Sequence, residues 1–434
     1  MGRNNNRSFG VISLLGLVLW VFVSYAPQRA WAENPDITEA GDILQIVLPA
    51  TAGVATLFEK DWEGTKQFTK SLGTALATTH AMKVTFRKLG PGESDKYSFP
   101  SGHTTSAFSG ASFIHTRYGY LWGIPAYLAA AFVVYSRVQA DAHFLDDVIA
   151  GASIAMLSNW YWATPYSPQV ALTPMAVKDG YGVQLNVLDT PLTNPAARSE
   201  PEVVSYPRWR FEFSLRRAYL SENKVTAPSD TGTQFSLDHF DKIDDPTTTA
   251  AVGLGISLDD RHEVNLWFAP FESQDHGYFN TPVLFQSTVF PTNTEIRSSY
   301  RLYETRIQYD YNLNPSGPWI GKVGGALSGK WAKVKLEMKN GPLAAEVQKW
   351  VVLPLLHLLG GYQLTPKLLI TADANWIRMA ANRHFDGGIS LRYQLNRHWD
   401  VGGGYRFYST KFDAGAIENE VTYQIAFFSM GYTF

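Results

Sequence analysis

Hydrophobic and polar positions change their spacing about halfway along the chain. From residue 33 to about residue 162 the sequence has the pattern of helices, interrupted by the loop-forming residues 91–92 and 100–102. From Trp209 onward, apolar and polar residues alternate one by one, which is typical of strands whose two faces differ. The chain is therefore expected to hold two domains, a helical one followed by a β one.

The first domain, over residues 33–162, is expected to be an all-α helical bundle. Its five helices are expected at residues 42–57, 62–87, 104–117, 120–135 and 143–161. Ser101 and Asp141 stand shortly before two of these helices and belong to the residue types that cap helix N-termini. A proline-rich linker over residues 163–207 follows, in which residues 180–182 (Gly-Tyr-Gly) are expected to turn a small hairpin.

The second domain, over residues 208–434, is expected to be an antiparallel transmembrane β-barrel of about ten strands, within a range of 8–12. The strands are expected near residues 208–220, 250–258, 262–271, 299–312, 317–337, 346–362, 366–376, 384–395, 398–411 and 420–434. Bacterial outer-membrane barrels have an even count, and the hairpin in the linker would raise it to twelve. Side chains fill the interior of a barrel of this size, so a general pore is not expected.

A soluble sandwich of two sheets would show the same alternation, but three features favour the barrel. The polar face carries many charges, as a wet barrel interior does. Some connections are tight, as at residues 396–397, whereas others are long and polar, as at residues 220–249 and 273–297. The last strand places Phe428, Met430, Tyr432 and Phe434 on one face, which resembles the terminal strand of outer-membrane barrels.

The first 32 residues have the three-part layout of a secretory signal peptide. Arg3 and Arg7 give a basic start, and residues 11–25 form an uncharged apolar run. Ala30 and Ala32 then supply small residues at the two positions that a signal peptidase recognises, so cleavage after Ala32 is expected. The alternative is an uncleaved anchor, but the apolar run is short for a membrane-spanning helix.

Composition narrows the classes of function. The 37 basic and 39 acidic residues nearly balance, so the basic excess of a nucleic-acid-binding protein is missing. The chain has no cysteine, which excludes disulfides, thiolate catalysis and cysteine-based zinc sites. Its 13 Trp, 22 Tyr and 25 Phe are many, and aromatic girdles at a membrane surface are one use for them.

Candidate chemistry lies within the helical domain. His143 and Asp147 are four residues apart on an expected helix and so share a face. A carboxylate beside an imidazole orients the ring and leaves its other nitrogen available as a nucleophile or base. By itself, however, such a pair is more often a surface ion pair.

A second group of residues could hold an anion. Ser101, Gly102 and His103 stand where a loop enters a helix, and the first N–H groups of a helix bind anions. His103 could give a proton to a leaving oxygen, although a plain cap with a solvated histidine would have the same sequence. Lys83 and Arg137 add positive charge, and each alone would be an ordinary surface cation.

Taken together, these residues resemble the signature of the type-2 phosphatidic acid phosphatase (PAP2) and vanadium haloperoxidase superfamily. That signature has Lys, six residues and Arg-Pro, then Pro-Ser-Gly-His, then Ser-Arg, five residues, His, three residues and Asp. Residues 100–103 and 136–147 match its last two parts, and the resemblance covers roughly residues 40–162. One position departs, because Gly90 stands before Pro91 where the family has Arg. Arg87 or Lys88 could reach the same phosphate oxygen from the preceding turn.

The resemblance implies a role for each residue. His143 would attack phosphorus to form a phosphohistidine, Asp147 would orient it, and His103 would protonate the leaving oxygen. The phosphoryl oxygens would be held by Lys83, Ser101, Gly102 and Arg137. These cations and N–H groups would meet the developing charge, so neither a metal nor a cofactor is expected.

The expected function is hydrolysis of phosphate monoesters, with lipid phosphates favoured over small periplasmic esters. Phosphatidic acid, phosphatidylglycerol phosphate and a lipid A phosphate are all reasonable substrates. Since only residues 119–135 approach spanning length and Pro125 interrupts them, the phosphatase domain is expected in the periplasm, tethered to the outer membrane by the barrel. Two alternatives remain: a weakened or inactive phosphatase on a structural or transport barrel, which Gly90 motivates, and a vanadium-dependent haloperoxidase.

Overall fold

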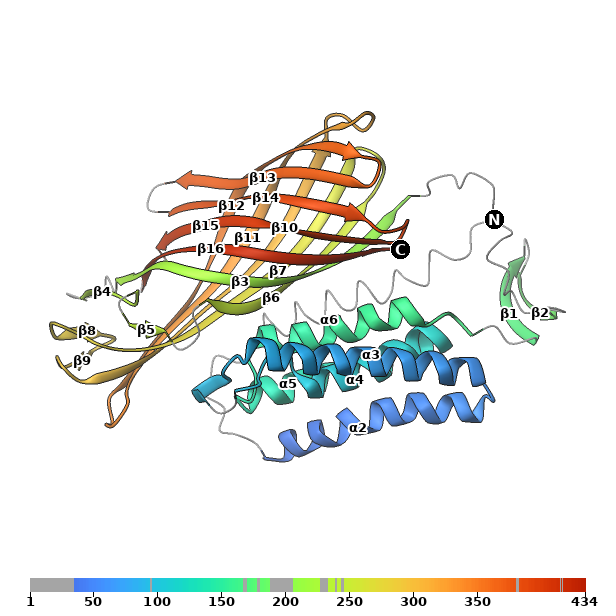
Figure 1. The fold of residues 1–434 in the computed structure, drawn as a ribbon, viewed down its shortest axis with the longest axis horizontal. Coiled ribbons are helices and arrows are strands. Elements are labelled where there is room, and N and C mark those ends of the chain that lie inside the picture. The colour runs from blue at the N-terminus through green and yellow to red at the C-terminus, as the bar shows by residue number, and fades with distance from the viewer. Residues whose placement is uncertain are drawn as a thin grey trace.

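The computed structural model describes residues 35–93, 96–166, 170–177, 180–187, 206–226, 233–238, 240–242, 246–379, 382–413, 415 and 417–434. The expected signal peptide lies outside the described residues, as does much of the linker, including residues 188–205. The described chain forms a helical bundle and a β-barrel that lie side by side along their length (Figure 1).

The bundle has five described helices, as the sequence predicts. They are α2 (Pro35–Phe58), α3 (Trp62–Phe86), α4 (Gly102–Tyr118), α5 (Tyr120–Gln139) and α6 (Leu145–Trp162), with a short 3₁₀ turn, η1 (Pro91–Glu93), between α3 and α4. The Ser101 side chain caps α4 by accepting a hydrogen bond from the N–H of Thr104. Asp141 is not a cap, contrary to the expectation, because it lies in a turn with a φ of 46°. Phe144 is the N-cap of α6, so His143 precedes the helix.

The linker hairpin stays apart from the barrel. Strands β1 (Val170–Val177) and β2 (Gly180–Val187) pair antiparallel in a sheet of their own. Val177 pairs with Gly180, so residues 180–182 belong to a strand and do not form the turn.

Ten long antiparallel strands close into the barrel, which confirms the expected number. They are β3 (Arg208–Thr226), β6 (Thr247–Ser257), β7 (His262–Tyr278), β10 (Glu295–Asn312), β11 (Trp319–Met338), β12 (Ala344–Thr365), β13 (Leu368–Met379), β14 (Asn382–Gln394), β15 (Trp399–Asp413) and β16 (Glu418–Thr433). Pairing of β7 with β10 and of β16 with β3 leaves no open edge. The described parts of the long connections carry four short strands: β4 (Gln234–Ser236), β5 (Asp241–Lys242), β8 (Val283–Phe285) and β9 (Thr288–Phe290).

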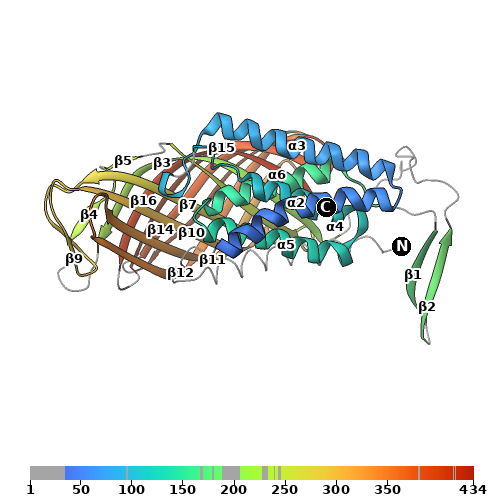
Figure 2. The ribbon, with the colours of Figure 1, turned by 90° about the horizontal axis from the view of Figure 1, so that it is seen from below.

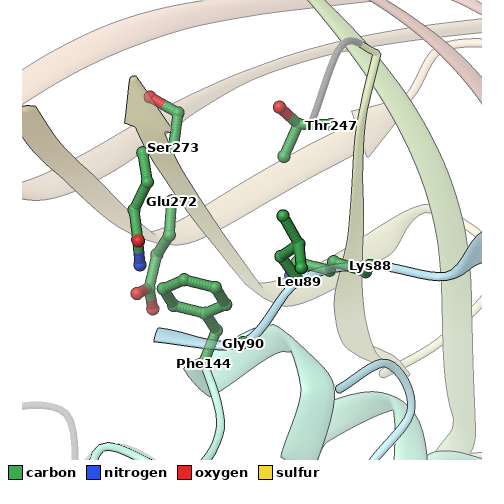
Figure 3. Close-up of a pocket in the computed structure, with 8 residues that line it drawn as sticks. Lys88, Leu89, Gly90, Phe144, Thr247, Glu272 and Ser273 are labelled. Atoms are coloured by element: carbon green, nitrogen blue, oxygen red, sulfur yellow. The ribbon is translucent and has the colours of Figure 1, made fainter. Parts of the chain in front are cut away.

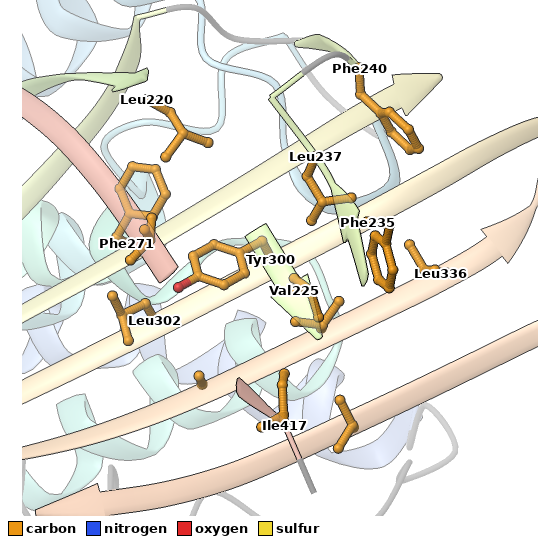
Figure 4. Close-up of a cluster of buried hydrophobic side chains, with 14 of the residues drawn as sticks. Leu220, Val225, Phe235, Leu237, Phe240, Phe271, Tyr300, Leu302, Leu336 and Ile417 are labelled. Carbon is orange, nitrogen blue, oxygen red and sulfur yellow. The ribbon is translucent and has the colours of Figure 1, made fainter. Parts of the chain in front are cut away.

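Side chains fill the barrel. In one part of the interior, charges pair with one another: Arg306 binds Glu304 and Asp386, and Arg406 binds Asp386 and Asp373. Towards the end with the long connections, the interior is apolar (Figure 4). The apolar side chains there include Leu220, Val225, Phe235, Leu237, Phe271, Tyr300 and Leu302.

The bundle packs against the outer wall of the barrel through α6. Leu157 of α6 shares a buried cluster with Phe213, Val252 and Phe268, on β3, β6 and β7. Phe213 faces outward, because successive strand residues alternate and the neighbouring Glu212 is paired with arginines inside the barrel. A surface that would otherwise contact lipid is therefore covered by protein.

Helix α6 runs along the wall from part-way along the barrel to the end beside the C-terminus (Figures 1 and 2). At its beginning, the N–H of Leu145 donates to the carboxylate of Glu272 on β7, at 3.2 Å. At its end, the ring of Trp160 contacts Phe211, Tyr432 and Phe434, beside the C-terminus of the chain.

Candidate active site

The seven residues expected to form the site meet at one end of the bundle, at the ends of four helices. Lys83 is in the last turn of α3, Ser101 to His103 begin α4, Arg137 is in the last turn of α5, and His143 and Asp147 flank the start of α6. The N–H of Ser101 donates to the carbonyl oxygen of Asp147, at 2.9 Å. A Cβ at Gly151 would lie 2.5 Å from the carbonyl oxygen of Ser101, so glycine allows α6 to approach this loop.

His143 and Asp147 are coupled through a third side chain. Nδ1 of His143 lies 3.6 Å from the Asp147 carboxylate, too far for a direct hydrogen bond. The fully buried Ser98 hydroxyl bridges them, at 3.0 Å from His143 Nδ1 and 2.5 Å from Asp147 Oδ2. Asp147 Oδ2 also accepts from the N–H of Phe144, which makes this carboxylate part of the helix cap. Nε2 of His143 has no hydrogen-bond partner among the described residues.

Lys88 lies behind this relay, the hydrogen-bonded chain from Asp147 through Ser98 to His143. Its ammonium is 2% exposed and donates to both oxygens of Asp146, at 2.8 and 2.7 Å, and to Asp147, at 3.0 Å. Burial alone would lower the pKa of Lys88, but the two carboxylates outweigh burial and raise that pKa above its usual value. Lys88 is thus committed to the buried acids, and not to a phosphate oxygen as the sequence suggested.

His103 and Arg137 share an acid from α2. Oδ1 of Asp42 lies 3.0 Å from Nε2 of His103 and 2.8 Å from Nη1 of Arg137. The guanidinium of Arg137 also donates to the carbonyl oxygen of Thr38, so α2 closes this side of the site. A phosphoryl oxygen would find the same two donors, which means that the half-exposed Asp42 carboxylate stands where substrate charge would bind.

Lys83 lies next to the start of α4. Its ammonium donates to the carbonyl oxygen of Tyr97, and its Cε would be 3.9 Å from a Cβ on Gly102. The site therefore combines one lysine, one arginine and the N-terminus of a helix. This combination binds anions.

The position where the family has Arg faces the barrel. Gly90 is buried and lines a small pocket at the contact of the two domains, with Phe144 and the barrel residues Thr247, Glu272 and Gln274 (Figure 3). Arg87 is exposed and donates to the carbonyl oxygen of Val84. Neither Arg87 nor Lys88 thus replaces the missing arginine in this arrangement.

Four contributors escaped sequence reasoning: Ser98, Asp42, Asp146 and Glu272. A lone serine or carboxylate has no diagnostic spacing, and Asp42 and Glu272 are far from the motif in sequence. Asp146 offered a signal, since an acid beside Asp147 at a buried helix start requires a cation nearby. Among the described residues, no group of three or more His, Asp or Glu side chains is arranged to hold a metal ion.

Comparison with known proteins identifies the class. The model of the PAP2 superfamily matches residues 53–169. The lipid A 4'-phosphatase of Helicobacter pylori is 30% identical over 170 residues, which are 36% of this chain and 83% of that enzyme. The chain belongs to the PAP2 superfamily.

Two further matches extend over less of the protein or show lower similarity. The lipid A 1-phosphatase of Porphyromonas gingivalis is 34% identical over 110 residues, which are 24% of this chain and 24% of that enzyme, so the chain spans about a quarter of that relative. The outer membrane protease OmpT of Escherichia coli aligns with 54% of this chain and 99% of its own, at 10% identity and a TM-score of 0.36. The closed barrel with an apolar outer face is itself the architecture of an outer-membrane protein.

Proposed function

We propose that the chain is a phosphatase that hydrolyses a lipid phosphate monoester through a phosphohistidine, without a metal. The relay from Asp147 through Ser98 to Nδ1 of His143 carries the proposal, because it leaves Nε2 as the attacking atom. The family resemblance supports the same assignment.

The reaction divides into two displacements. Nε2 of His143 forms a bond to phosphorus while the ester P–O bond breaks, and His103 gives its proton to the leaving alkoxide. Water then attacks the phosphohistidine and loses its proton to His103, which releases phosphate and restores His143. Lys83, Arg137 and the N–H groups at the start of α4 bind the phosphoryl oxygens in both steps.

A lipid is favoured as the substrate because the phosphatase domain is fixed to an outer-membrane barrel. The relatives named above are lipid A phosphatases, which supports the same substrate class. Cleavage after Ala32 stays a prediction. A periplasmic position of the bundle also stays a prediction. The packing of α6 on the barrel wall argues instead for a position at the depth of the barrel.

The test is phosphate release by the detergent-solubilised protein without added metal. Short-chain phosphatidic acid and a soluble phosphate ester serve as parallel substrates. His143→Ala is expected to lower the rate by at least about 10⁴-fold, as loss of a nucleophile does, while the barrel keeps its heat-modifiable gel mobility. Acid-labile, base-stable phosphate on the wild-type chain alone would identify the phosphohistidine.

Equal release by wild type and His143→Ala would refute the nucleophile assignment. Absence of release from either substrate would favour an inactive domain on a structural barrel. In that case, conductance of the barrel in a planar bilayer would be the next measurement.

A further inference from the structure

The outer face of the barrel marks how deep the protein sits in the membrane. On β7 the outward residues are apolar up to Phe268 and become polar at Glu272, Gln274 and His276. On β3 the same change falls between Leu215 and Arg217. Outward charges are costly in hydrocarbon, so this level marks one edge of the apolar layer.

The catalytic end of the bundle lies at that edge. Glu93 pairs with His276 and Arg297, and Asp141 pairs with Arg301, just beyond the last outward apolar residues. The ring of Phe86, in the last turn of α3, packs on Arg217. Polar contacts therefore hold the loops of the site at the level where a headgroup would be.

The connections of the barrel tell which edge this is. The C-terminal end of α6 lies beside Tyr432 and Phe434, where strands are joined by the short segments 258–261, 366–367 and 395–398. The long connections, 227–246 and 279–294, are at the opposite end. Outer-membrane barrels have short turns in the periplasm and long loops outside. The site is thus at the external edge.

The uncharged helical segments of the bundle match the thickness of the apolar layer of a membrane. Residues 43–58 of α2, 120–136 of α5 and 148–162 of α6 contain no charged residue or histidine. Runs of about 15–17 helical residues extend roughly 22–26 Å, close to the apolar band of about 25 Å on outer-membrane barrels. Charges return at both ends, with Glu63, Lys66 and Lys70 at the end away from the site.

Apolar side chains on α2 and α5 face away from the protein. Among the described helices, these two are long and apolar enough to cross a membrane. The exposed side chains are Ile43, Ile46, Val47, Val54, Leu57 and Phe58 on α2, and Leu121, Trp122 and Leu128 on α5. Ile46 is 66% and Leu121 is 71% exposed. Soluble proteins rarely expose so large an apolar surface, and the wall that α6 abuts is itself part of the lipid-facing belt.

We propose that the bundle lies within the hydrocarbon layer of the outer membrane, with acyl chains covering α2 and α5. The phosphatase site then opens at the outer leaflet, and its substrate is a lipid phosphate of that leaflet. The identity of the substrate rests on the proposed function, whereas the depth and orientation rest on the packing alone.

Labelling of single cysteines tests the orientation, since the chain has none of its own. Lys96→Cys places a thiol on the exposed loop at the site, and Glu59→Cys places one at the other end of the bundle. Lys339→Cys and Lys367→Cys mark the two ends of the barrel in the same way. Intact cells of a Gram-negative host are treated with a membrane-impermeant maleimide, with and without permeabilisation of the outer membrane.

We expect positions 96 and 339 to react in intact cells, and positions 59 and 367 only after permeabilisation. Reaction of position 96 only after permeabilisation, as at position 367, would place the site in the periplasm and overturn the proposal. Reaction of both 59 and 96 in intact cells would also overturn it, since the bundle would then lie outside the bilayer. Phosphate release by each variant in detergent is measured separately, so an inactive protein with the expected labelling would refute the enzyme and leave the orientation standing.

Discussion

The cluster of buried charges inside the barrel and the one in the bundle differ in what the last group of each faces. Inside the barrel, Lys330 and Arg306 bind Glu304, and Arg306 continues to Asp386. Beside them lies His384, whose ring nitrogens have no hydrogen-bond partner among the described residues but which is only 2% exposed within the filled barrel. In the bundle, the chain of contacts from Lys88 through Asp147 and Ser98 ends at the His143 imidazole, whose Nε2 has no hydrogen-bond partner in the described part of the chain. Both clusters bear the cost of desolvation. Only the cluster in the bundle ends beside the cations and the helix N-terminus of an anion site, so the bundle is where chemistry on a substrate is expected.

Removing the lysine of each cluster tests this difference most strongly. Lys88→Met leaves Asp146 and Asp147 buried without a cation, which should destabilise the bundle by about 3–5 kcal/mol and abolish measurable phosphate release. Lys330→Met, the matched change in the barrel, should lower the temperature of heat modification while the folded fraction keeps the wild-type kcat. Loss of catalysis in both variants, or in neither, would erase the distinction.

Removing the Ser98 hydroxyl distinguishes a role in positioning His143 from a role in stabilising the fold. Ser98→Ala removes the link between Asp147 and His143, so kcat should fall by about 10²-fold, the low end for assisted proton positioning, with KM nearly unchanged. Ser106→Ala, which removes a half-buried hydroxyl bound to the carbonyl oxygen of Gln45 outside the site, is the control. A matching loss in both variants would indicate general destabilisation.

Glu272 shows how far the barrel supports the site. Glu272→Ala leaves the hydroxyl of Tyr303 and the N–H of Leu145 without their acceptor, which costs roughly 1–3 kcal/mol. The temperature of thermal inactivation of phosphate release should therefore fall by several degrees. Glu346→Ala, on a half-exposed pair with Lys333, should leave that temperature unchanged. An unchanged temperature for Glu272→Ala would mean that the bundle keeps its active geometry without this contact.

The smallest effect is expected at Asp42. Asp42→Asn removes a negative charge from His103 and Arg137, so inorganic phosphate should inhibit more strongly. The inhibition constant should fall by about 1.5- to 5-fold, the range of a half-exposed charge pair. Thr38→Ala, whose backbone contact with Arg137 remains, serves as the control. Weaker inhibition in Asp42→Asn would instead show that the carboxylate mainly orients His103.

The sequence predicted much of the fold, because each domain has a strong period. Alternation over β10 and β14, for example, leaves no doubt about strands, and ten were expected and found. The side-by-side packing was missed for a physical reason. Phe213, Val252 and Phe268 must be apolar whether lipid or α6 covers them, so their sequence does not reveal the helix.

The site was predictable as far as its motif extends. The structure gathers His103, His143 and Asp147, although the helical spacing of the last two does not explain their contact, since His143 precedes the helix. Lys88 was misjudged because sequence does not show that it points back towards Asp146. Partners supplied from other elements, such as Asp42, depend on tertiary packing alone.

The shortness of the uncharged helical runs bears on how the protein reaches its membrane. A chain bound for the outer membrane must first be exported through the inner one, where long apolar helices are retained. The run in α6 falls below the roughly 20 residues of a typical spanning segment, the run in α5 is at the lower end of the spanning range, and α4 carries Thr104, Ser109 and Ser112 in its core. Such helices favour release by the translocon over retention. They would then assemble once the barrel wall at β3, β6 and β7 supplies the apolar partner that α6 needs.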